Sequence, residues 1–118
     1  IDIGQVEGAF VQGMGWLTAE ELWWDAKGRL RTAGPSTYKI PGSRDAPAVF
    51  NVHLLENAPA GVATVFRSKG IGEPPLLLAT AVWLAIRDAL DGADLDAPAT
   101  PERIAMAASG KEEGNFFF

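Results

Sequence analysis

The sequence predicts an α+β fold for this chain of 118 residues. Apolar residues at helical spacing predict a Gly-rich helix near the N-terminus. Alternating residues on both sides of a turn predict a β-hairpin, and two later segments are suited to form one or two further strands. A nearly continuous apolar run then predicts a long helix, and a short C-terminal helix follows it.

The N-terminal helix is expected over residues 5–17. Its apolar residues recur every three or four positions, as one face of a helix requires: Val6, Phe10, Met14 and Leu17. The same segment contains three glycines: Gly8, Gly13 and Gly15. Each glycine inside a helix costs roughly 1 kcal/mol relative to alanine. The close approach of another backbone or of a ligand would offset that cost, and the sequence leaves both explanations open.

The hairpin is expected from two strands, 18–24 and 29–32, joined by the turn sequence at 25–28. The segment 48–55, with Val52 and Leu54 on one face, predicts another strand. Residues 63–66 predict a further short strand. Together these segments are the β part of the predicted α+β fold.

The long helix is expected over residues 76–90, after Pro74 and Pro75. Its only polar residues are Thr80, Arg87 and Asp88. A helix that is apolar on nearly every face is normally buried, so we expect it to pack inside a larger body. Thr100 and Pro101 then predict the start of the short helix at 102–108. The tail at 109–118 is expected to be poorly ordered.

Composition excludes several kinds of site from this chain. Ten basic and fifteen acidic residues give a net charge of −5, without the basic cluster that nucleic-acid binding needs. Without cysteine and with only His53, the chain offers no disulfide, iron–sulfur ligand or protein-only metal site. No apolar run approaches the ~18 residues of a membrane span. We expect a cytoplasmic protein, and the opening without Met suggests a truncated or processed chain.

The segment 68–75, SKGIGEPP, has the pattern most suggestive of chemistry. Gly70 and Gly72 allow the backbone to pass close to a bulky group. Glu73 follows them at the start of the predicted long helix, where the helix dipole attracts negative charge. A carboxylate beside a cavity can act as a general base. The plainer interpretation is that Glu73 is a helix cap or a surface acid.

Four motifs along the chain together resemble one known family. They are IDIGQVEGAFVQGMG at 1–15, GPSTYKIP at 34–41, SKGIGEPPLLLA at 68–79 and ATPERI at 99–104. In order and spacing they resemble the C-terminal end of the molybdopterin-binding subunit of the xanthine dehydrogenase/oxidase family, the molybdenum hydroxylases. The resemblance covers residues 1–108, which it identifies as a segment of a larger molybdopterin-binding domain.

The resemblance assigns roles to five residues. The glutamate of the GEPP motif is the family's active-site base, which removes a proton from the molybdenum-bound hydroxyl, and this implies that role for Glu73. The glutamine of the GQVEGAF motif contacts the cofactor in the family, which implies cofactor binding by Gln5. Gly70, Ile71 and Gly72 would line the pocket beside the metal. The plainer alternatives are a helix cap for Gln5 and an ordinary glycine-rich turn at 70–72.

The resemblance also implies a function that the chain performs only within a complete enzyme. That function is hydroxylation of a purine, xanthine or hypoxanthine, at the molybdenum cofactor. Iron–sulfur clusters, FAD and NAD would be bound by other parts of an oligomeric complex, and the remainder of the subunit would complete the site. The chain alone is expected to be inactive. The alternatives are hydroxylation of an aldehyde or another N-heterocycle, and a non-catalytic structural or interaction fragment.

Overall fold

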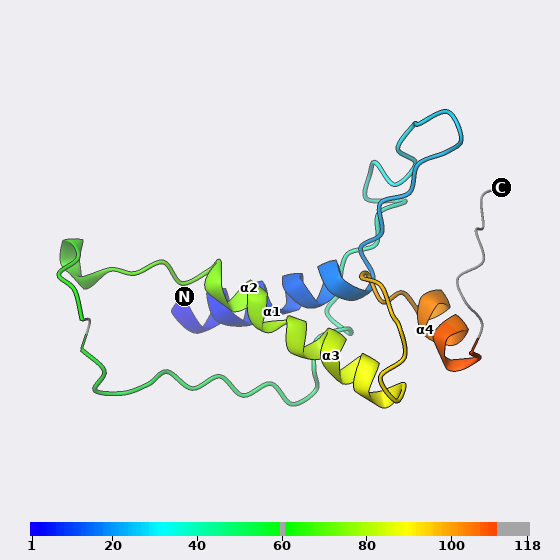
Figure 1. The fold of residues 1–118 in the computed structure, drawn as a ribbon. Helices are drawn as coiled ribbons and strands as arrows, with labels where there is room; N and C mark the ends of the chain where they lie inside the picture. The colour runs from blue at the N-terminus through cyan, green and yellow to red at the C-terminus, as the bar shows by residue number, and fades with distance from the viewer. Residues whose placement is uncertain (60, 111–118) are drawn as a thin grey trace.

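The computed structural model describes residues 1–59 and 61–110 (Figure 1). Its regular elements within these ranges are all helical: α1 (Asp2–Thr18), the 3₁₀ turn η1 (Val65–Arg67), α2 (Pro74–Leu78), α3 (Thr80–Ala89) and α4 (Pro101–Ala108). A long connection leads from α1 to η1, and a short one, residues 68–73, leads from η1 to α2. The predicted α+β class is therefore wrong, because the β part is not formed.

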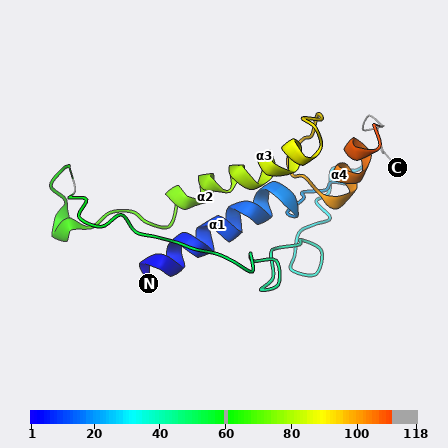
Figure 2. The same cartoon turned by 90° about the horizontal axis from the view of Figure 1, so that it is seen from below.

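Helices α1 and α2 lie side by side and run in the same general direction, as Figures 1 and 2 show. Small residues form their contact: Ala9, Gly13 and Ala79 are buried. A Cβ built on Gly13 would lie 2.8 Å from the Cβ of Ala79 and would also collide with the backbone carbonyl of Leu76. The close approach of another backbone therefore accounts for Gly13, one of the two explanations that the sequence left open.

The long helix predicted at 76–90 is divided into α2 and α3 at Ala79. The Thr80 hydroxyl donates a hydrogen bond of 2.8 Å to the carbonyl oxygen of Leu77, a side-chain bond that accompanies the break. Helix α4 begins at Pro101, where the Thr100 hydroxyl accepts a hydrogen bond from the N–H of Arg103. The hydroxyl cap and the proline at the first position thus start a helix where the sequence predicts one.

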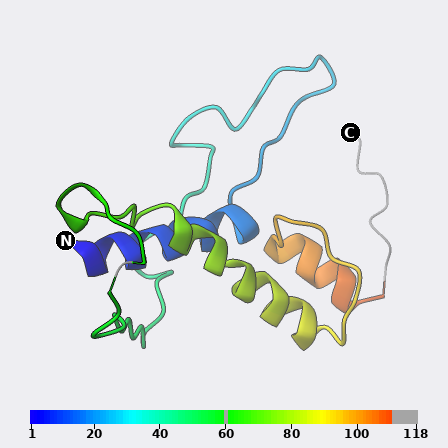
Figure 3. The same ribbon diagram turned by 60° about the vertical axis from the view of Figure 1, so that its left-hand side comes forward.

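The segment before α4 attaches it to the far end of α1 (Figure 3). The N–H of Ala99 donates a 2.7 Å hydrogen bond to the carbonyl oxygen of Leu17. Arg103 forms an ion pair with Glu21 at 3.3 Å, just beyond α1. Ser109 and Gly110 close α4 by bonding to its last carbonyl oxygens. The rest of the predicted tail, 111–118, lies outside the described residues.

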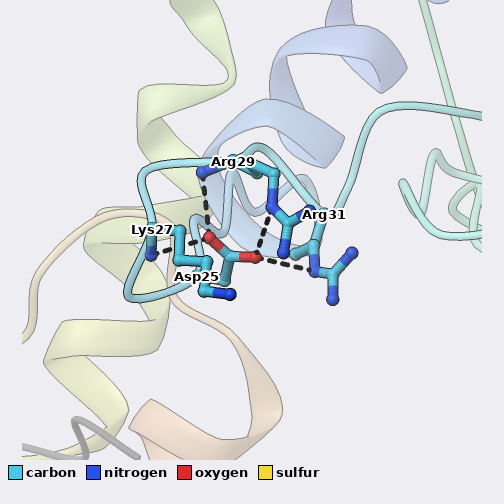
Figure 4. Close-up of polar contacts among 4 residues, drawn as sticks. All are labelled: Asp25, Lys27, Arg29 and Arg31. Carbon is cyan, nitrogen blue, oxygen red and sulfur yellow. Dashed lines mark hydrogen bonds and ion pairs between the residues drawn. The ribbon is translucent and has the colours of Figure 1, made fainter.

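The predicted hairpin forms a turn but not a sheet. A single antiparallel bridge joins Trp24 to Leu30, and the first predicted arm begins inside α1, which continues to Thr18. Figure 4 shows why the turn itself persists. One Asp25 carboxylate oxygen accepts backbone hydrogen bonds from Lys27 and Arg29, at 2.9 and 3.0 Å. The other oxygen pairs with the side chains of Arg29 and Arg31, at 3.2 and 3.3 Å.

These bonds stabilise the charged form of Asp25. The hydrogen bond from the backbone N–H of Arg29, with further contributions from Lys27 and Arg31, lowers the pKa of Asp25 from its ordinary value of 3.8. A carboxylate with a lowered pKa contributes stability that is fully present above its unfolded pKa. The turn should therefore be intact at neutral pH and weaken as the pH falls below 3.8, through the folded pKa.

The substitution Asp25→Ala is expected to loosen this turn, because four interactions converge on one carboxylate. Trypsin cleaves after Lys27, Arg29 and Arg31, so limited proteolysis of the full-length protein measures the opening directly. We expect severalfold faster cleavage at these sites. Asp88→Ala, on the exposed side of α3, is the control and should leave the rate unchanged. Equal rates for wild type and Asp25→Ala would contradict the stabilising role.

The two later predicted strands are also absent. Residues 48–55 find no partner strand among the described residues, and an extended segment without a partner does not make a sheet. Its Phe50 instead packs on Phe10 of α1, with ring centroids 5.3 Å apart. In the segment 63–66, Val65 begins η1, and Phe66 has a φ of 49°. That left-handed backbone conformation is incompatible with a strand.

The chain has a small apolar interior and a large apolar surface. Among the residues that the structure describes, the buried hydrophobic ones are few and mostly small: Ala9, Ala79, Leu95 and Ala99. Trp16, Trp23 and Trp24 are each more than half exposed, so they are not core residues of this chain. The accessible surface is 9446 Å², against about 6200 Å² for a compact monomer of this mass. The radius of gyration is 18.0 Å, whereas a compact domain of the same length would have a radius of gyration of about 13.5 Å.

Within the ranges that the structure covers, no helix has the length and apolar character needed to cross a membrane.

Candidate functional site

A groove of about 500 Å³ lies between the first half of α1 and the start of α2. It joins segments that are more than 60 residues apart in the sequence, because the contact at Gly13 brings α2 alongside α1. Its lining consists of glycine and alanine residues, one leucine, two amides and one carboxylate: Gly4, Gln5, Gly8, Ala9, Gln12, Gly72, Glu73 and Leu76. Three of the five site residues singled out from the sequence therefore share one groove.

Gln5 lies in the first turn of α1 and does not cap it. The helix begins after Ile1, whose side chain makes no capping bond, and the backbone N–H of Gln5 donates to the Ile1 carbonyl oxygen at 2.9 Å. The Gln5 side chain reaches the opposite wall instead. A Cβ built on Gly72 would lie 3.1 Å from Oε1 of Gln5. The absence of a side chain at Gly72 thus makes room for the Gln5 amide.

Glu73 immediately precedes α2 and has an α-helical backbone, with φ −77° and ψ −45°. Its side chain makes no capping bond, so the interpretation as a helix cap fails. The side chain is exposed, and no hydrogen bond or ion pair to the described residues occupies its carboxylate. The expected help from a helix dipole is weak, because α2 has only 5 residues. What the structure offers at Glu73 is a free carboxylate on the rim of a groove.

Gly70 and Ile71 do not line this groove. Gly70 is exposed and Ile71 is half-buried, and both belong to the irregular segment that leads from η1 to Glu73. A Cβ built on Gly70 would meet no atom within 4 Å, so nothing in this chain requires a glycine there.

The groove floor includes residues that the sequence argument did not single out. Gly4 and Gly8 lie on the groove side of α1, and a Cβ on either would meet no atom within 4 Å. Gln12 closes the far end of the same face. Its seven-residue spacing from Gln5 marks one helical face and could have identified it. No three His, Cys, Asp or Glu side chains gather as a metal-ion site in the part of the chain described.

The GPSTYKIP motif lies away from the groove and is held to the end of α1. The Tyr38 hydroxyl donates a hydrogen bond of 2.6 Å to Oε2 of Glu20. This bond to a carboxylate raises the pKa of Tyr38 above its ordinary value of 10.0. Pro41 packs against Gly15 of α1, where a Cβ would collide with the proline ring. The motif therefore has a packing role within this chain.

Residues 1–47 match a family model described as "Molybdopterin cofactor-binding domain". That match includes all of α1 and hence Gln5 and Gln12. Over 114 residues the chain is 55% identical to xanthine dehydrogenase of Dictyostelium discoideum, an alignment covering 88% of this chain and 8% of that protein. The chain belongs to the xanthine dehydrogenase/oxidase family.

Similarity to other members of the family is equally extensive. Identity to the xanthine dehydrogenase/oxidase of Rattus norvegicus is 50% over 119 residues, which is 91% of this chain and 9% of the relative. Identity to xanthine dehydrogenase 1 of Arabidopsis thaliana is 47% over 124 residues, again 91% of this chain and 9% of the relative. The chain thus spans less than a tenth of the length of these xanthine dehydrogenases.

The groove fits the ring of a pterin better than its phosphate. Pterin rings present hydrogen-bond donors and acceptors along their edges, and the amides of Gln5 and Gln12 offer both kinds of group. The bare backbone at Gly4 and Gly8 leaves space for a flat ring. No lysine or arginine lines the groove, whose only charged group is the Glu73 carboxylate. In a xanthine dehydrogenase, a cofactor phosphate would therefore need partners outside this groove.

Proposed function

We propose that residues 1–108 form the C-terminal segment of the molybdopterin-binding domain of a purine hydroxylase. In this proposal the chain contributes the catalytic base, Glu73, and one wall of the cofactor pocket, including Gln5 and Gly72. The observation that carries it is the shared groove, which brings a cofactor-type amide and an unpaired carboxylate together. The identity of about half the residues to proteins named xanthine dehydrogenase supports the reaction.

The chemistry of this chain would be proton transfer and positioning. When bound, the molybdenum cofactor supplies the redox chemistry. The Glu73 carboxylate accepts a proton at the reacting centre, and it is free to do so because it has no partner among the described residues. The Gln5 amide fixes the adjoining ligand edge, and its packing on Gly72 ties that contact to the residue next to the base. Holding the base and the ligand in one geometry lowers the entropic cost of reaction.

In this proposal, other parts of the enzyme complete the active site. Gly70 and Ile71 are proposed to line the pocket beside the metal, although they lie outside the groove within this chain. Iron–sulfur clusters, FAD and NAD would be carried by the remainder of an oligomeric, cytoplasmic complex. The isolated chain should be inactive, because its groove is open and the remainder of the site is proposed to lie elsewhere in the enzyme.

The substrate is tested with the complete enzyme, in which kcat/KM for xanthine is compared with kcat/KM for benzaldehyde. We expect xanthine to be preferred by about a hundredfold or more, because a site built to hydrogen-bond a heterocycle discriminates strongly against a ligand without those groups. Molybdenum content, measured in parallel, confirms that the enzyme is loaded. A preference for benzaldehyde would contradict the purine assignment and favour the aldehyde hydroxylase alternative.

A further inference from the structure

Both glutamines of the chain, Gln5 and Gln12, line the same groove. Seven residues separate them, which is nearly two full helical turns, so both side chains project from one face of α1. Glutamine amides are neutral and combine two N–H donors with a carbonyl acceptor. The groove therefore has a matched pair of uncharged hydrogen-bonding groups on one wall, of which the sequence singled out only Gln5.

The surface between the two amides is nearly flat. Gly8 and Ala9 occupy it, so no side chain larger than a methyl group intervenes, and a Cβ on Gly8 would meet no atom within 4 Å. Along the axis of α1 the two glutamines are about 10.5 Å apart. A ligand in contact with both amides must be elongated. A single metal ion cannot meet that condition, whereas an extended heterocycle can.

Gln12 is available for such a ligand. Its side chain is exposed and forms no hydrogen bond with any residue that the structure describes. Gln12 is also not needed for the packing of α1 on α2, because Gly13 and Ala9 form that contact. The residue lies within the segment 1–47 that matches the molybdopterin-binding family model.

We propose that Gln12 is a second amide of the cofactor site, which hydrogen-bonds the pterin of the molybdenum cofactor at the end of the groove opposite Gln5. This inference rests on the proposed function, because it assumes that the groove holds that cofactor. In this arrangement the flat ring lies on the open face of α1, and the two glutamines hydrogen-bond its polar edges. The ring is thereby fixed at two points, which restrains its rotation as one contact cannot.

The test uses the complete enzyme with the substitution Gln12→Met, which keeps an unbranched side chain of similar length and removes the amide. The measurement is the rate at which purified, loaded enzyme releases molybdenum and pterin on mild heating, followed by metal analysis and pterin fluorescence. Loss of one hydrogen bond is expected to speed release about 3- to 10-fold. Gln12→Glu, which retains an acceptor oxygen and loses the N–H donors, should give an intermediate rate.

The matched control is Glu7→Met, on the same helix but outside the groove, which should release cofactor at the wild-type rate. Unchanged release from Gln12→Met would overturn the role of Gln12, and so would equal acceleration by Glu7→Met. Should Gln12→Met not fold, Gln12→Glu decides the matter by the same comparison. Wild-type enzyme without molybdenum or pterin would instead contradict the proposed function, so the two failures are distinguishable.

Discussion

The substitution Glu73→Gln is expected to lower xanthine turnover by the complete enzyme by about two to four orders of magnitude, the usual contribution of a general base. Glutamine has nearly the shape of glutamate but cannot take up a proton. Because the Glu73 side chain makes no capping bond at α2 and no bond to other described residues, the change should cost no folding stability. Molybdenum and pterin should therefore remain bound at wild-type levels.

The measurement is kcat for xanthine, normalised to molybdenum content. Glu102→Gln is a close control, because Glu102 is another exposed acid at the start of a helix that begins with proline. It should retain full turnover. If Glu73→Gln kept wild-type activity at equal molybdenum content, Glu73 would not be the base. If activity and cofactor were lost together, the residue would have a binding role in place of a catalytic one.

The substitution Gly13→Ala is expected to destabilise the packing of α1 on α2 by about 2 kcal/mol. The new methyl group would meet the Ala79 side chain and the Leu76 carbonyl oxygen, a backbone atom that cannot rotate away. Overpacking of this kind typically costs about 1–3 kcal/mol, and we expect a value near the upper end because a backbone atom is involved. The better helix propensity of alanine offsets only roughly 1 kcal/mol of that cost. The thermal midpoint of the cofactor-free enzyme should fall.

Gly8→Ala supplies the opposite expectation on the same helix. No atom lies within 4 Å of a Cβ at Gly8, so only the helix propensity changes. The free energy of unfolding should stay the same or rise by up to about 1 kcal/mol. The thermal midpoint should accordingly stay the same or rise. Scanning calorimetry of the two cofactor-free variants gives the comparison, and cofactor binding cannot contribute to either value. A Gly13→Ala midpoint equal to that of Gly8→Ala would show that the helices can separate without cost.

Local sequence patterns were enough to locate the helices. Strands form only beside other strands, and a local pattern does not show whether such a neighbour exists. Thr100 with Pro101 identifies the start of α4 because the cap bond is formed within the same turn. The apolar run at 76–90 indicates helix but hides the break at Ala79. The segment 48–55 has strand-like composition, yet a strand forms only beside another strand, and none lies next to it in the described residues.

The site was predictable only in its parts. Family resemblance selected Gln5 and Glu73, whereas residue chemistry alone favoured a helix cap or a surface acid for Glu73 and offered a helix cap as the plainer alternative for Gln5. That these two residues share one groove depends on the packing of α2 against Gly13, a contact that no sequence pattern specifies. Gln12 was missed because an isolated polar residue on a helix is ordinarily solvated. Its seven-residue spacing from Gln5 places it on the same helical face, and the groove shows that this face is lined on the other side by α2.

The scarcity of large buried side chains has a consequence for when the site comes into being. Burial of apolar surface is the main source of folding stability, and the interior here is built largely from alanine and glycine. The described interior therefore contributes little folding stability, and we expect surfaces elsewhere in the enzyme to cover the exposed tryptophans and leucines. In the proposed enzyme, Gln5 and Glu73 would take up their final positions once those surfaces are in place. Assembly would thus also act as the step that switches on the proton acceptor, and incompletely assembled enzyme would hold no competent base.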